Sequence, residues 1–208
     1  QGVRISGLTY RHCLGINPAH NGHGAGIYGL NANQVILENL ILVNNHAFDN
    51  LYGTNVEETK GGGGGAYFTS SRNIRVQSVL FYNNSASIKG GGLGFAQSAS
   101  QILLRNLTFE KNTAAYGGGF FMGSNAGQHV EATGEDIKFV GENTGHQSGG
   151  AIYITTNDLN LDYQVSPNPE YQIGDGTTSF SLQNSMIFGS QSVEGGGVYV
   201  EGGARTTF

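Results

Sequence analysis

Apolar and polar residues alternate in a series of short segments, and the alternation shifts by one position near the middle of each. In residues 35–42 the apolar side chains stand at positions 35, 37, 40 and 42, with Asn39 at the shift. A period of two is typical of a β-strand with one buried face. Asparagine tolerates the left-handed backbone that a sharp bend requires. The segment therefore predicts two short strands joined by a one- or two-residue corner at Asn39.

The same pattern returns along the chain. Close copies occupy residues 3–10, 74–81 and 102–109, with Gly7, Ser78 and Asn106 at the corner. Residues 130–139 and 180–188 fit when about one inserted residue is allowed. Self-similarity on this scale is typical of a solenoid, in which each repeat packs on the next.

Gly-Gly pairs form a second recurring motif. Each pair precedes a small or apolar residue and opens a third short strand, as in Ala66-Tyr67-Phe68. The pairs begin at Gly64, Gly91, Gly118, Gly149 and Gly196. With the bent segments, they predict three short strands in every repeat.

Three strands per repeat predict an all-β fold, a right-handed parallel β-helix of about six coils. Each strand then pairs in parallel with its counterpart one coil along, about 4.8 Å away. Residues 1–208 are expected to form one domain, with an insertion loop at about 155–178. The alternative is a β-sandwich with glycine-rich turns, but Asn21-Gly22 is the one Asn-Gly hairpin signal in the sequence.

A third motif places asparagine three residues after a large apolar residue. Phe81 and Asn84 form one such pair, and Phe109 and Asn112 form another. Equivalent asparagines at a turn can stack coil upon coil and hydrogen-bond through their amides. The expected ladder and corner residues are Asn39, Asn45, Asn84, Asn106, Asn112 and Asn143. In the last copy, Phe188 to Gln191, glutamine is expected at the ladder position.

These motifs resemble the repeats of the chlamydial polymorphic outer membrane proteins, and more widely those of the pectin-lyase-like β-helix class. The residues that carry the resemblance are Gly65-Ala66-Tyr67, Gly150-Ala151-Ile152 and Gly197-Val198-Tyr199, with the Phe81/Asn84 and Phe109/Asn112 pairs. It covers about residues 24–200. The resemblance implies a β-helix and an adhesive role at a cell surface.

Composition and charge exclude several other classes. Ten Lys and Arg face 15 Asp and Glu, for a net charge of −5, which argues against a nucleic-acid partner. Cys13 is the only cysteine, so an internal disulfide is excluded. No apolar stretch is long enough to span a membrane as a helix. The low charge and the high glycine content favour an extracellular or cell-surface location.

Catalysis is not expected, although β-helices also host polysaccharide lyases and hydrolases. Glycoside hydrolysis needs two nearby carboxyl groups, and the five aspartates include no adjacent pair. Gly22-His23-Gly24 matches a tripeptide of polygalacturonases, but the other signatures of that family are missing. A carbohydrate-binding or carbohydrate-active β-helix is therefore the alternative to a structural or adhesive module.

Two weak metal motifs are present. His20 and His23, near His12 and Cys13, supply imidazole and thiolate ligands suited to zinc or copper. Asp158, Asn160 and Asp162 offer alternating oxygen ligands, as the first part of a calcium loop does. The glycine and the distal glutamate of such a loop are absent. Calcium is the one cofactor that the sequence leaves open.

Two N-glycosylation sequons begin at Asn83 and Asn106. Scattered tyrosines on a solenoid flank are suited to a glycan or host-surface ligand. The sequence opens and closes within strand motifs, at Val3 and at Arg205 to Phe208. End-to-end self-association into a fibre is therefore expected, with a fragment of a longer β-helix as the alternative.

Overall fold

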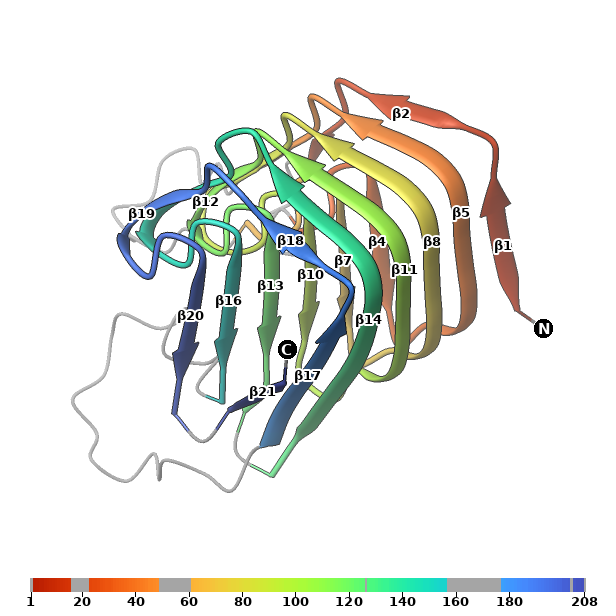
Figure 1. Cartoon of the computed structure of the whole chain (residues 1–208). Coiled ribbons are helices and arrows are strands. Elements are labelled where there is room, and N and C mark those ends of the chain that lie inside the picture. Colours follow the sequence, from red (N-terminus) through yellow and green to blue (C-terminus); the bar gives the residue numbers. More distant parts are fainter. Residues whose placement is uncertain are drawn as a thin grey trace, which may run out of the picture.

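The computed structural model describes residues 2–15, 23–48, 61–125, 127–156, 177–202 and 204–207. These residues form β-strands and connecting turns and contain no helix. The strands belong to three sheets that run side by side along one axis (Figure 1). We call them sheets A, B and C. The described residues therefore form a single stack of coils.

Sheet A contains the longest strands. Its members are β1 (Val3–Ser6), β2 (Thr9–Arg11), β5 (Asn33–Val43), β8 (Arg72–Tyr82), β11 (Ser100–Glu110), β14 (His129–Val140), β17 (Thr177–Gln183), β18 (Met186–Ile187) and β21 (Arg205–Thr207). In the first and the last coils the strand is split, as β1 and β2 and as β17 and β18.

Sheets B and C complete each coil. Sheet B contains β3 (Leu14–Gly15), β6 (His46–Ala47), β9 (Ser85–Ala86), β12 (Thr113–Tyr116), β15 (Thr144–Ser148) and β19 (Gln191–Glu194). Sheet C contains β4 (Ile27–Leu30), β7 (Ala66–Thr69), β10 (Leu93–Ala96), β13 (Phe120–Gly123), β16 (Ile152–Thr155) and β20 (Val198–Glu201). Four of the five Gly-Gly pairs stand immediately before strands of sheet C, as predicted, and Ala151 separates the pair at Gly149 from β16.

Every strand pair is parallel, and the coils stay in register along the axis. In sheet A, Val35 pairs with Ile74, Ile74 with Ile102, and Ile102 with Ala132. Parallel pairing between successive coils is the pattern of a parallel β-helix and excludes the antiparallel sandwich. The predicted fold of about six coils with three strands each is confirmed. The interior of the predicted insertion, residues 157–176, lies outside the described residues.

The predicted corner is a bend within one strand, and this corrects the expected division of the coil. Asn39, Ser78 and Asn106 have φ angles of 52°, 53° and 50° and lie inside the 11-residue strands β5, β8 and β11. A single left-handed residue turns the alternation by one position while pairing continues on both sides. The third strand of each coil is instead the short strand of sheet B, whose two residues in β6 and β9 carry no alternation.

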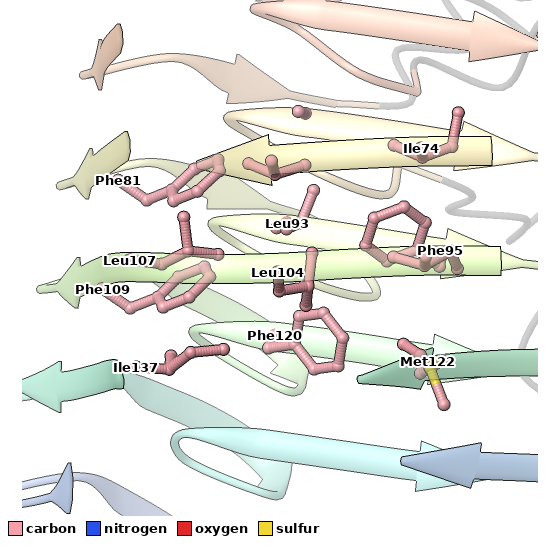
Figure 2. Packing of buried hydrophobic residues seen from close by; sticks show 14 of the residues in the cluster. Ile74, Phe81, Leu93, Phe95, Leu104, Leu107, Phe109, Phe120, Met122 and Ile137 are labelled. Atoms are coloured by element: carbon pink, nitrogen blue, oxygen red, sulfur yellow. The ribbon is translucent and has the colours of Figure 1, made fainter. Parts of the chain in front are cut away.

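The core fills the space between the sheets with stacked apolar columns (Figure 2). Phe81, Phe109 and Phe139 stack with ring centroids 4.7 Å apart at each step. Ile187 pairs with Phe139 and continues this column, whereas Phe188 is 72% exposed. The expected place of Phe188 in the repeat is therefore wrong by one residue.

One glycine column lets neighbouring coils approach closely. A Cβ atom at Gly92 would lie 2.7 Å from the Gly119 carbonyl oxygen and 2.8 Å from Cδ1 of Phe109. Ala151 and Gly197 occupy the same column, just before Ile152 and Val198. At Gly197 a Cβ would meet only Ile187, at 3.5 Å. Glycine is therefore required at Gly92, where the neighbouring coil lies close, but not at Gly197 in the last complete coil.

Gly92→Ala is expected to lower the free energy of unfolding by about 2 kcal/mol, because backbone and a stacked ring must shift. Gly197→Ala is the matched control and should change it by less than about 0.5 kcal/mol. Urea unfolding followed by circular dichroism measures both. Equal effects of the two substitutions would contradict the close-packed column.

Candidate functional site

The four predicted ladder asparagines form a hydrogen-bonded row. Asn45, Asn84, Asn112 and Asn143 are completely buried. The Nδ2 of Asn45 donates to Oδ1 of Asn84 at 3.0 Å, Asn84 donates likewise to Asn112, and Asn112 to Asn143. The backbone N–H of the same residue donates to the same oxygen at 3.0–3.1 Å in each step. The Oδ1 atoms of Asn84, Asn112 and Asn143 therefore each accept two hydrogen bonds from the preceding coil.

The second amide hydrogen ties the ladder to the end of sheet A. The Nδ2 of Asn84 donates to the Leu42 carbonyl at 2.8 Å, and that of Asn112 to the Phe81 carbonyl at 2.9 Å. Buried polar groups are costly unless they are paired, so a completely paired row fixes the turn and the spacing of coils together.

The row extends by one position at each end, with different residues. Leu14 pairs with His46, so Cys13 stands at the ladder position of the first coil. The backbone N–H of Cys13 donates to Oδ1 of Asn45 at 3.0 Å. At the other end Gln191 pairs with Thr144, so Ser190 holds the ladder position and the expected glutamine does not. The prediction counted three residues on from Phe188, whereas the residue of the apolar column is Ile187, three residues before Ser190, and this shift of one explains the misplacement. The Ser190 hydroxyl oxygen is buried without a hydrogen-bond partner in the described part of the chain.

The corner asparagines and the sequons lie outside this buried row. Asn39, Asn83 and Asn106 are exposed. The Nδ2 of Asn83 donates to Oδ1 of Asn44 at 2.7 Å, and that of Asn106 to the Ser78 hydroxyl at 3.1 Å. Both sequon asparagines therefore present their amides at the surface.

The metal motifs are only partly described. His20, Asp158, Asn160 and Asp162 lie outside the described residues, and His23 lies within them. The His23 ring stacks on Tyr67 with centroids 4.5 Å apart, and its Nδ1 accepts the Gly62 N–H at 3.1 Å. Across the described ranges, no group of three or more His, Cys, Asp or Glu is placed to hold a metal ion.

An aromatic column runs along the outer face of sheet C. Its members in register are Tyr28, Tyr67, Phe121, Tyr153 and Tyr199, with Gly94 between the second and the third. Tyr67, Phe121 and Tyr153 are no more than 2% exposed. The column is therefore a second apolar cluster, not an open platform for sugar rings.

Glycine and lysine complete this cluster. The Tyr67 ring lies over Gly94, where a Cβ would come within 2.6 Å of it. Lys89 is fully buried, with its Nζ 5.3 Å from the Phe121 ring centroid. Sequence reasoning missed Tyr28, Tyr67 and Phe121. Their signal is the second strand position after each Gly-Gly motif, which alternation turns outward.

Two carboxylates face the C-terminal end of the column. Burial raises the pKa of Tyr153, and the hydrogen bond that its hydroxyl donates to Glu201 raises it further. The negative charge of Glu194 raises the pKa of Tyr199. Both phenols therefore remain neutral hydrogen-bond donors.

A groove of about 670 Å³ lies on the outer face of sheet A, over its first four coils. Arg4 and Arg75 line it, together with Ile36, Leu103 and three side-chain amides. The two arginines are 71 positions apart in the sequence (4 to 75). Only the winding of the chain into coils brings them to the same groove. Sequence analysis did not identify this groove.

Comparison with protein-family models, with curated proteins and with solved structures gives no match. The described part of the chain contains no helix long and apolar enough to cross a membrane.

Asn112→Ala is expected to lower the free energy of unfolding by about 3 kcal/mol, because the buried amides of its neighbours lose their partners. Asn106→Gly is the control: it keeps the positive φ and removes one exposed hydrogen bond, so its effect should stay below about 0.5 kcal/mol. Chemical unfolding measures both. Similar losses at the two positions would contradict the buried ladder as the stabilising element.

Ser190→Asn is expected to raise the melting temperature by a few degrees, the shift that about 1 kcal/mol produces in a domain of this size. Its Oδ1 can accept the Asn143 N–H and so lengthen the row by one amide. Differential scanning calorimetry measures the change. Gln191→Asn, on the exposed neighbouring position, should leave the melting temperature unchanged, and an equal rise there would argue against ladder extension.

Proposed function

We propose that this chain is a non-catalytic structural or adhesive β-helix module of the cell surface or extracellular space, and that copies stack end to end. The observation that carries the proposal is that apolar core residues of the two end coils are only partly buried. Ile5, Tyr10 and Ile27 pack against the core from one end and are only partly buried. Ile187, Val198 and Ala204 do so from the other.

The two ends also match in register. Ile27 and Val198 belong to one column of sheet C, and Tyr28 and Tyr199 to the next. A second copy placed with β4 beside β20 continues both columns and pairs two open strand edges. Open parallel edges are templates for further strands, because their N–H and C=O groups lack partners.

Strand β21 limits this contact. Sheets B and C end at β19 and β20, whereas β21 lies one strand beyond β17 in sheet A. A copy that pairs its β3 and β4 with β19 and β20 needs the place of β21 for its own β1. Stacking in full register therefore requires β21 to leave the sheet.

The motif resemblance to chlamydial surface proteins supports the same proposal. The carbohydrate-binding alternative is favoured by a separate observation, the arginine-lined groove of sheet A.

Sedimentation velocity over a range of concentrations tests stacking. Val200 is 40% exposed and pairs with the core residue Ile154. We expect concentration-dependent association of the wild-type chain, stronger association when the chain ends at Gly202, and a monomer for Val200→Lys. Ile41→Lys, at an outward position of the second coil that is 43% exposed, should associate like the wild type.

A monomer at every concentration for both the wild type and the shortened chain would overturn end-to-end stacking. So would equal association of the two lysine variants, provided that circular dichroism shows both folded. Cleavage of pectic or algal polysaccharides by the purified chain would overturn the non-catalytic part of the proposal.

A further inference from the structure

We propose that the groove on the outer face of sheet A binds an anionic polysaccharide, with Arg4 and Arg75 holding acid groups of the glycan that lie two coils apart. The inference stands apart from end-to-end stacking, because the groove runs along the side of the stack. It gives the module a ligand class that the motifs alone do not supply.

The floor of the groove alternates charge and apolar surface along the axis. Arg4 pairs with Ile36, Ile36 with Arg75, and Arg75 with Leu103, so the four side chains form one outward column. Two coils span about 10 Å, because each coil rises about 4.8 Å. That span is comparable to a disaccharide, so an acid group on every second sugar can meet successive arginines. Ile36 and Leu103 then face the apolar C–H surfaces of the rings.

A row of amides borders this column. Gln34, Asn73 and Gln101 are exposed, line the groove and have φ angles of 58°, 55° and 56°. These bent positions mark the start of the long strands in three successive coils. Amide side chains both donate and accept hydrogen bonds, as sugar hydroxyls require. The repeat of the coils therefore presents the same polar group to each successive unit of an extended chain.

The two arginines differ in how they are held. Nε and Nη2 of Arg4 donate to Oε1 of Glu38 at 2.9 and 2.5 Å, which fixes its guanidinium and lowers the pKa of Glu38. Arg75 is exposed and makes no side-chain hydrogen bond or ion pair with the described residues. A guanidinium binds carboxylate and sulfate groups through parallel hydrogen bonds, so Arg75 is the stronger contact.

Charge favours a local site over diffuse attraction. The whole chain carries −5, so a polyanion is repelled by the average field and must be held by specific groups. Arg105, one coil beyond Arg75, forms an ion pair with Glu135, with its Nη2 3.2 Å from Oε2. Arg75 forms no ion pair with the described residues, although its charge helps to lower the pKa of Glu38, so its guanidinium is open to an acid group in the groove.

Fluorescence polarisation with a labelled heparin oligosaccharide tests the site on the full chain. We expect saturable binding that weakens with salt, and a loss of about tenfold in Arg75→Gln, the effect of removing one charge-assisted hydrogen-bonded pair. Lys138→Gln removes the same charge from an exposed position on β14 outside the groove, and should change the affinity by less than about twofold.

Leu103→Glu keeps both arginines but places a carboxylate on the floor beside Arg75, so it should weaken binding by at least as much as Arg75→Gln. Two unlabelled polymers serve as competitors of the labelled heparin: polygalacturonate, which carries carboxylates, and unsulfated dextran, which is neutral. Displacement by polygalacturonate but not by dextran supports recognition of acid groups. Equal losses in Arg75→Gln and Lys138→Gln, equal competition by dextran, or equally tight binding of single-stranded DNA would each overturn the proposal. All three variants must retain the wild-type circular dichroism spectrum and melting temperature.

Discussion

Register between successive coils is the constraint on which the structure depends. Each coil must bury the same columns as the one before it, or the backbone hydrogen bonds along the axis and the apolar interior cannot both form. The asparagine ladder enforces this, because the Oδ1 of Asn84 and that of Asn112 each accept one hydrogen bond from the backbone N–H and one from the Nδ2 amide of the asparagine in the preceding coil. A shift of one residue would leave a buried amide unpaired, which costs more than a single apolar contact gains.

Much of this architecture is visible in the sequence, because its signals are periodic. Alternation around Asn39 and the Gly-Gly pairs located two of the three sheets, and the spacing of Asn84 and Asn112 located the ladder. The two-residue strands of sheet B gave no signal, since they owe their conformation to neighbouring coils. Asparagine occurs both at a bend within one strand and at a turn between two strands, so the residue type alone does not distinguish them. The strand pairing on both sides of Asn39 shows that this position is a bend within one strand.

Side surfaces were harder to foresee, because their residues converge only after the chain has wound. The groove joins Arg4 to Arg75 across two turns, and the column on sheet C joins Tyr28 to Tyr199 across the whole stack. The last repeat was misplaced for a local reason: Ile187, not Phe188, continues the apolar column, so the ladder position three residues on is Ser190 and not Gln191. The additional residue between Phe139 and Asn143 is absorbed at the turn, and strand pairing continues on both sides of it.

The ladder also gives the molecule a direction. All its amide carbonyls face the coil that precedes them, so their dipoles add along the axis instead of cancelling. Two copies meeting through identical ends would set like poles against each other. A two-fold symmetric pair is thereby disfavoured, and a contact through unlike ends that continues the axis of the stack repeats without closing. End-to-end association of the kind proposed would therefore build a filament whose two tips are chemically distinct.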